Sequence, residues 1–114
     1  MKSSTLEQDP GRIEIAEIVR RLATRFQPHK IILFGSHARG TASADSDADL
    51  LVVMPVQGSR RKLATEMELA LAGVNIPADL IVVTPEQLRR DENRRGTVVH
   101  PAVREGIVLY ERVG

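Results

Sequence analysis

Residues 30–54 read KIILFGSHARGTASADSDADLLVVM, and this stretch decides the fold. A short apolar run, Ile31 to Phe34, ends at Gly35, which is typical of a buried strand followed by a sharp turn. Residues 35–46 are rich in Gly, Ser, Ala and Thr and predict a loop or a short helical turn. A second apolar run covers Leu50 to Met54. The stretch therefore predicts two strands joined by a polar loop.

Before this stretch, the pattern is helical. Asp9-Pro10 predicts a helix start, with Asp9 as the N-cap and Pro10 in the first turn. Apolar residues then recur at helical spacing from Ile15 to Phe26, and the helix should end before Pro28.

After it, helical and strand patterns alternate. Residues 60–72 predict a helix, Leu80 to Val83 a third buried strand, and Thr84-Pro85 a further helix with a Thr84/Gln87 capping box. The chain should end with a helical turn near residues 98–104 and a last strand at residues 106–110. This order predicts a single α/β (α+β) domain over residues 1–114, with a β-sheet flanked by helices.

The composition fits a globular domain and excludes several kinds of site. Hydrophobic residues make up 42% and charged residues 27% of the chain, and there is no cysteine. Disulfides, thiolate-bound zinc and a cysteine nucleophile are therefore excluded. The N-terminus is polar and no apolar run is long enough to span a bilayer, so we expect a cytoplasmic protein without membrane contact. The formal net charge of +1 leads us to expect no direct nucleic-acid binding.

Gly35-Ser36 ends the first strand with residue types that suit a phosphate group. Glycine lets the backbone turn sharply and approach a ligand closely. Free N–H groups and a hydroxyl at such a turn can bind phosphate, especially where a helix follows. The same pair also occurs in ordinary strand-ending turns, so alone it does not decide between the two interpretations.

Asp47 and Asp49 lie two residues apart at the start of the second strand, so their side chains point to the same face. Paired carboxylates repel each other unless a cation or a basic partner is present. Mg²⁺ prefers hard oxygen ligands and is commonly held by one or two carboxylates plus substrate phosphates. The alternative is that both are ordinary turn and strand-entry residues, where aspartate is common.

Asp79 stands directly before the third apolar strand. If the second and third strands are neighbours, the three carboxylates converge near one edge of the sheet. Three carboxylates can hold two metal ions about 3.5–4 Å apart, the arrangement used for in-line displacement at phosphorus. The alternative is an exposed loop aspartate after Pro77.

Two motifs together resemble the signature of the polymerase-beta-like nucleotidyltransferases: GSHARG at residues 35–40 and SDADL at residues 46–50. The short length, the N-terminal helix and the ending at residues 104–111 are similar to the minimal nucleotidyltransferase (MNT) branch, and the resemblance covers nearly the whole chain. It implies a mixed β-sheet flanked by helices. It also implies transfer of a nucleoside monophosphate from an NTP to a hydroxyl group, with release of pyrophosphate.

The resemblance also implies roles for single residues. Gly35 and Ser36 would hold the triphosphate of ATP, the nucleotide donor. Asp47 and Asp49 would bind two Mg²⁺ ions, and Asp79 would bind the catalytic ion and help to deprotonate the acceptor hydroxyl.

Other residues of the first motif are less defined. Arg39 would either steady the phosphates or shape the loop through a salt bridge, and both interpretations stay open. His29, His37 and His100 lack metal-ligand spacing and are assigned no role, although His37 could touch phosphate from within the loop.

Two other nucleotide sites are excluded by the sequence. Gly35 and Gly40 have the spacing of a Walker phosphate loop, but Thr41-Ala42 stands where Lys-Ser/Thr is required. A dinucleotide site of the Rossmann type fails because no G-x-G-x-x-G is present.

Three functional hypotheses follow from the resemblance. Many MNT proteins resemble antitoxins that transfer AMP to a partner HEPN-domain toxin, and we expect this activity and a hetero-oligomer with such a partner. A small-molecule (antibiotic-type) nucleotidyltransferase is the first alternative; those enzymes usually carry an additional helical acceptor domain, which this sequence lacks. The second alternative is a non-catalytic antitoxin that acts by binding alone.

Overall fold

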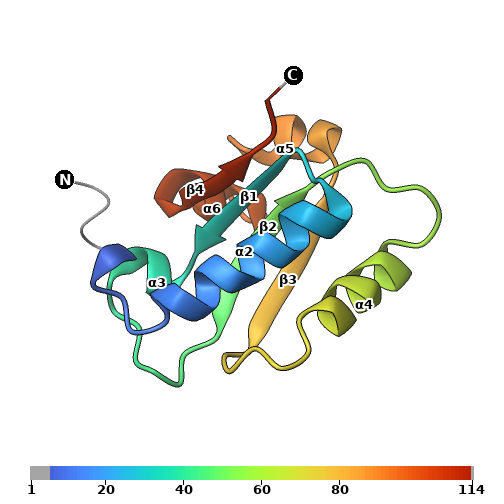
Figure 1. The fold of residues 1–114 in the computed structure, drawn as a ribbon. Coiled ribbons are helices and arrows are strands. Elements are labelled where there is room, and N and C mark those ends of the chain that lie inside the picture. Colours follow the sequence, from blue (N-terminus) through green and yellow to red (C-terminus); the bar gives the residue numbers. More distant parts are fainter. Residues whose placement is uncertain (1–5, 114) are drawn as a thin grey trace.

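The computed structural model describes residues 6–113, which form a four-stranded sheet with helices on both faces (Figure 1). In chain order the elements are α2 (Arg12–Phe26), β1 (Lys30–Phe34), α3 (Ser36–Arg39), β2 (Ala48–Val53), α4 (Arg60–Ala70), β3 (Ala78–Val83), α5 (Pro85–Asp91), α6 (Val99–Glu105) and β4 (Ile107–Glu111). The predicted order of helices and strands is confirmed, and the polar loop after β1 opens with the short helix α3.

The sheet is mixed, with strand order β3-β2-β1-β4. β1 is antiparallel to both β2 and β4, whereas β2 and β3 are parallel and are connected through α4. Parallel strands begin at the same end of a sheet. Residues at the starts of β2 and β3 therefore lie side by side, and Asp49 pairs in register with Asp79.

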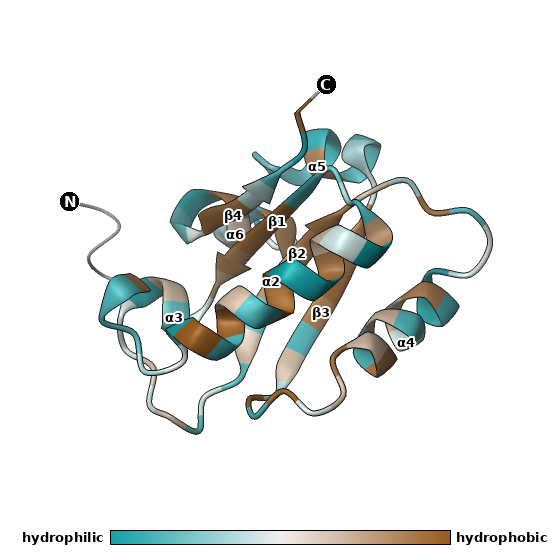
Figure 2. Ribbon diagram, in the orientation of Figure 1, coloured by the Kyte–Doolittle hydropathy of each residue, from teal (hydrophilic) through white to brown (hydrophobic). Residues whose placement is uncertain are grey.

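The two central strands, β1 and β2, are buried along most of their length, which explains their nearly continuous apolar sequences. One face packs against α2 and α4, through buried residues that include Ile18, Leu22, Ile31, Leu50, Met67 and Val82. The other face packs against α6, through Ile32, Leu51, Val53, Val83, Val99 and Ala102. In Figure 2 the strands at the centre are largely brown, while the helices carry teal segments. No helix within residues 6–113 combines the length and apolarity needed to cross a membrane.

The start of α2 differs from the prediction. Its N-cap is Gly11, and no side chain caps the helix. The Asp9 carboxylate accepts the N–H of Gly11 at 2.8 Å and lies 2.6 Å from Nδ1 of His37. Asp9 as the N-cap was therefore wrong: α2 begins two residues later than predicted. Oδ2 of Asp9 is shared between the N–H of Gly11, in the turn before the helix, and the distant ring of His37. The predicted end before Pro28 is confirmed.

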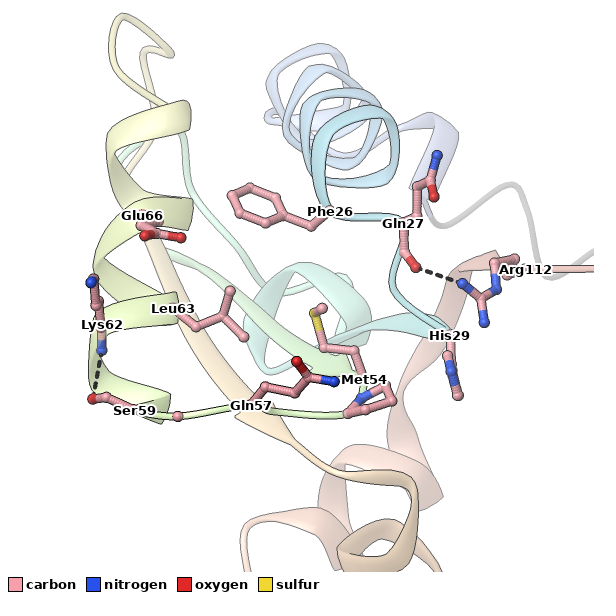
Figure 3. Close-up of a pocket in the computed structure, with 12 residues that line it drawn as sticks. Phe26, Gln27, His29, Met54, Gln57, Ser59, Lys62, Leu63, Glu66 and Arg112 are labelled. Carbon is pink, nitrogen blue, oxygen red and sulfur yellow. Dashed lines mark hydrogen bonds between the residues drawn. The ribbon is translucent and has the colours of Figure 1, made fainter.

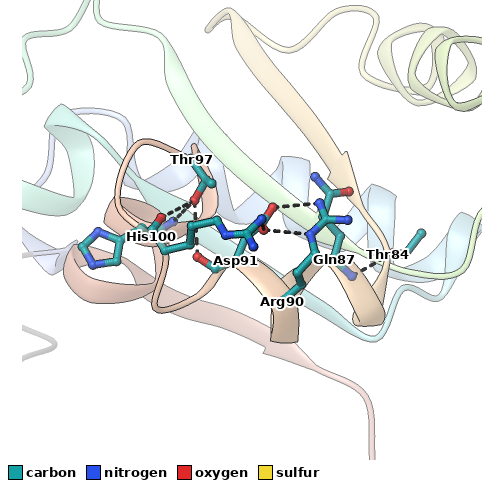
Figure 4. Close-up of polar contacts among 7 residues, drawn as sticks. Thr84, Gln87, Arg90, Asp91, Thr97 and His100 are labelled. Carbon is teal, nitrogen blue, oxygen red and sulfur yellow. Dashed lines mark hydrogen bonds and ion pairs between the residues drawn. The ribbon is translucent and has the colours of Figure 1, made fainter.

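Polar contacts shape α5 and the turn that follows it (Figure 4). The Thr84 hydroxyl accepts the N–H of Gln87 at 3.1 Å, which confirms the predicted N-cap. The Gln87 side-chain oxygen is buried and has no partner among the described residues, so the reciprocal half of the capping box is absent. Arg90 donates two hydrogen bonds to the buried Asp91 carboxylate, at 2.9 and 3.0 Å, and the Thr97 hydroxyl donates to the Asp91 carbonyl at 3.3 Å.

Candidate active site

The structure brings the three predicted carboxylates to one end of the sheet. Asp47 directly precedes β2, Asp49 lies within it, and Asp79 lies opposite Asp49 on β3. Residues in register on neighbouring strands share a face, as do residues two apart along one strand. Asp47 and Asp79 are exposed and Asp49 is partly buried. The site prediction required the second and third strands to be neighbours, and β2 and β3 are paired.

The mutual repulsion of these carboxylates is visible at Asp49. Partial burial raises the pKa of the Asp49 carboxyl, and the charges of Asp79 and then Asp47 raise this pKa further. His37 and Arg39 act in the opposite direction, without cancelling the rise in the pKa of Asp49. Concentrated negative charge of this kind favours a bound cation.

Gly35 begins the polar loop after β1 and lies against the carboxylate of Asp49. Its backbone has φ 75° and ψ −154°, a conformation essentially restricted to glycine. A Cβ atom at Gly35 would overlap Oδ2 of Asp49. Glycine is therefore required twice here, for the turn after β1 and for the close approach of the Asp49 carboxylate to the loop backbone.

The other two predicted ligand residues lie on α3. Ser36 is its first residue and is partly exposed. Arg39 is exposed, and its Nη1 lies 3.8 Å from Oε1 of Glu105 at the end of α6. A long, exposed ion pair of this kind contributes little stability. The charge of Arg39 acts to lower the pKa of Asp49, so Arg39 lies near the carboxylates. Its two predicted roles, steadying the phosphates and shaping the loop, remain hypotheses.

The donor set of this site suits a hard divalent cation. Three carboxylates supply oxygen ligands only, and after burial the charges of Asp79 and Asp47 contribute to the raised pKa of Asp49. Within residues 6–113, no group of three His, Asp or Glu side chains is placed so that it could hold a metal ion. Mg²⁺ often takes remaining ligands from water and substrate phosphates, so these residues fit a Mg²⁺–nucleotide complex better than a metal ion alone.

Sequence reasoning missed one residue of this region, His37. It is fully buried on α3, with Nδ1 2.6 Å from Oδ2 of Asp9 and Nε2 3.0 Å from the carbonyl oxygen of Ser46. Both ring nitrogens are therefore bound within the protein and do not face a phosphate site. A partner 28 residues away cannot be recognised from local spacing.

A cavity of about 630 Å³ lies at the other end of the sheet (Figure 3). Its lining comes from the end of α2, the loop after β2 and the first turns of α4, and includes Phe26, Met54 and Leu63. Met54 follows the last residue of β2, whereas Asp49 is near the first. The length of β2 therefore separates this cavity from the carboxylates.

The raised pKa of Asp49 leads to a prediction about stability. An acid whose pKa is higher in the folded than in the unfolded protein loses stability as the pH rises through the folded pKa. Asp49→Asn removes this penalty, so without metal we expect it to raise Tm at pH 7, and the gain should vanish below the usual pKa range of aspartate. For a domain of about 100 residues, 1 kcal/mol shifts Tm by roughly 4–8 °C.

The measurement is thermal unfolding of both proteins from pH 3 to pH 8 in a chelating buffer. The control is Asp45→Asn, which removes an exposed carboxylate from the same loop. Equal Tm values for wild type and Asp49→Asn at pH 7 would contradict the electrostatic account of this site.

Three solved structures are similar to this fold. A protein of Sulfolobus solfataricus assigned as a nucleotidyltransferase superposes with a TM-score of 0.60 at 18% identity, covering 97% of this chain and 87% of that chain. A mutant of the toxin–antitoxin pair MntA–HpeT gives a TM-score of 0.60 at 24% identity, over 86% of this chain and 72% of that chain. A toxin–antitoxin structure with AMP-PNP gives 0.52 at 25% identity, over 88% and 73%.

Among curated proteins, none matches the chain significantly. The sequence family described as the nucleotidyltransferase domain matches residues 14–108. This range contains α3 with its preceding glycine, the whole of β2 and β3, and all three carboxylates. The chain therefore belongs to the nucleotidyltransferase domain family, and its mixed sheet has the polymerase-beta-like fold that the two motifs predicted.

Proposed function

We propose that this nucleotidyltransferase transfers AMP from ATP to a hydroxyl group of a partner protein in a Mg²⁺-dependent reaction. We further propose that it is the antitoxin of a pair whose toxin is a HEPN-domain protein, and that residues 1–114 act as one MNT domain. The observation that carries the chemistry is the register of Asp49 with Asp79, next to Asp47 and against Gly35.

In this proposal Asp47, Asp49 and Asp79 hold two Mg²⁺ ions, and Gly35 and Ser36 hold the triphosphate. The ions, when bound, neutralise charge on the phosphates and on the attacking oxygen. The carboxylates and the loop keep the acceptor hydroxyl and the α-phosphate aligned, which is the main requirement of phosphoryl transfer.

The acceptor oxygen forms a bond to the α-phosphorus as the bond from that phosphorus to the bridging oxygen breaks. Pyrophosphate leaves with the electron pair of the broken bond, and the carboxylate of Asp79 takes the hydroxyl proton.

Two observations favour a protein acceptor. Asp47 and Asp79 are exposed, so this end of the sheet is open to a large partner. The cavity of about 630 Å³ lies at the opposite end of the sheet, whereas the one beside Arg39 and Gly40 is smaller, at about 330 Å³. The toxin–antitoxin structures similar to this chain, one of them with AMP-PNP, support an ATP-dependent role toward a partner chain.

The test is incubation of the protein with Mg²⁺, ATP and the product of the neighbouring gene, the candidate HEPN partner, followed by intact mass spectrometry. We expect the partner to gain one or more AMP units, and the Asp47→Ala, Asp49→Ala double variant to transfer none. A panel of aminoglycosides and simple alcohols in place of the partner tests the small-molecule alternative.

Each other outcome identifies a different function. Efficient transfer to a small alcohol, with no effect on the partner, would show an antibiotic-type enzyme. A partner that is bound and inhibited without gaining mass would show an antitoxin that acts by binding alone.

A further inference from the structure

His37 is placed between the two motifs of the proposed site. It follows Gly35-Ser36 on α3, and its Nε2 lies 3.0 Å from the carbonyl oxygen of Ser46, the residue before Asp47. The intervening residues 39–45 are mostly exposed. One buried ring therefore bridges the base of a loop whose two ends carry the proposed phosphate and metal ligands.

The other ring nitrogen of His37, Nδ1, is also held by a hydrogen-bond partner. Nδ1 lies 2.6 Å from Oδ2 of Asp9, and this oxygen also accepts the N–H of Gly11 at 2.8 Å. The side chains of His37 and Asp9 are 0% and 1% exposed. Burial of such polar groups is tolerated when they are paired with each other, so the segment before α2 holds the imidazole in one orientation.

The partners define where the hydrogens lie. A backbone carbonyl can only accept, so Nε2 must carry a hydrogen to bond to Ser46. The short contact between Nδ1 and the Asp9 carboxylate requires a second hydrogen between those two atoms. The ring therefore donates to Ser46 through Nε2 and shares a hydrogen with Asp9 at Nδ1.

Hydrogen bonds hold the backbone on both sides of Asp47. On its N-terminal side, Ser46 is bound by His37; on its C-terminal side, the N–H of Ala48 donates to the carbonyl of Pro77 at 2.9 Å. Pro77 lies two residues before Asp79, so this second bond ties the starts of β2 and β3 together. The exposed Asp47 side chain therefore projects from a backbone that is fixed at both neighbouring residues.

We propose that His37, oriented by Asp9, is a positioning residue that fixes the Ser46–Asp47 peptide and thereby places Asp47 for metal binding. The inference rests on the proposed function of the carboxylates, but it concerns how the loop is held and can be tested without any transfer reaction.

Two variants separate the bond to Ser46 from the bond to Asp9. The amide nitrogen of Asn is attached at the position of Nδ1, and that of Gln extends to the position of Nε2. Both variants also carry Asp9→Asn, so neither leaves an unpaired buried charge. His37→Gln with Asp9→Asn can still donate to the Ser46 carbonyl, whereas His37→Asn with Asp9→Asn cannot.

The readouts are amide hydrogen exchange in residues 43–47 and binding of Mn²⁺ alone, followed by electron paramagnetic resonance. We expect the Asn double variant to exchange faster in this segment and to bind Mn²⁺ about 10- to 100-fold more weakly, the usual effect of losing a residue that orients metal ligands. The Gln double variant should stay close to wild type. Equal Mn²⁺ affinity and equal exchange in the two double variants would overturn the proposal.

A measurement on the wild-type protein covers the case in which a variant does not fold. Nitrogen-15 NMR of the histidine rings should show a hydrogen on Nε2 of His37 that exchanges slowly with water. A ring without this hydrogen would exclude the bond to Ser46 and overturn the proposal. If both results hold but no AMP is transferred, the positioning inference stands and the proposed function fails.

Discussion

Asp49→Asn is expected to lower AMP transfer by about 1,000-fold or more while leaving the protein folded. The substitution keeps the size of the side chain and removes its charge, so the site loses one of its proposed metal ligands. Bound metal ions contribute several kcal/mol of transition-state stabilisation, and about 4 kcal/mol corresponds to a factor of 1,000 in rate. The measurement is kcat/KM for AMP transfer at saturating Mg²⁺.

Asp45→Asn is the matched control, because it removes an exposed carboxylate two residues before Asp47 in the same loop. We expect this variant to retain wild-type transfer. The Asn variant at position 49 should be more heat-stable than wild type without metal, so its loss of activity cannot come from unfolding. Opposite changes in stability and activity are typical of charged groups kept for function. Transfer by Asp49→Asn within tenfold of wild type would refute the assignment of Asp49 as a metal ligand.

The sequence predicts the elements of this fold well because their signals are local. The apolar run before Gly35 became β1, and the run after Asp49 became most of β2. A resemblance of two short motifs was enough to identify the family, which the match over residues 14–108 confirms. The convergence of Asp49 with Asp79 depended on strand order, and the parallel pairing of β2 and β3 established it.

Contacts between distant segments were not predictable in the same way. Asp9 before Pro10 has the local pattern of a helix N-cap, but its carboxylate binds both the N–H of Gly11 and the buried ring of His37, and α2 begins only after Gly11. Gln87 has the spacing of a capping box, yet only the Thr84 half of that motif forms. The distant partner of Asp9 could not be recognised from local sequence, and nothing in the structure explains why the Gln87 half of the capping box does not form.

Gly35→Ala is expected to reduce AMP transfer by about 100-fold, although Gly35 contributes no side chain to the site. The added methyl group would overlap Oδ2 of Asp49, so either the carboxylate or the loop must move. A displacement of about 1 Å in a catalytic group can cost a factor of 100. Both proposed halves of the site, the phosphate loop and the metal-binding carboxylates, meet at this contact. We therefore expect weaker Mn²⁺ binding together with the loss of turnover.

The control for backbone strain is Gly58→Ala. Gly58 has φ 82°, close to the 75° of Gly35, but no atom lies within 4 Å of the Cβ that the substitution would add. Both variants should lose stability, because a backbone with positive φ costs a residue other than glycine roughly 1–3 kcal/mol. Only Gly35→Ala should lose activity, because only there does the methyl group meet a carboxylate. If both variants lose stability equally and both keep full transfer and Mn²⁺ affinity, the loop and Asp49 do not form one site.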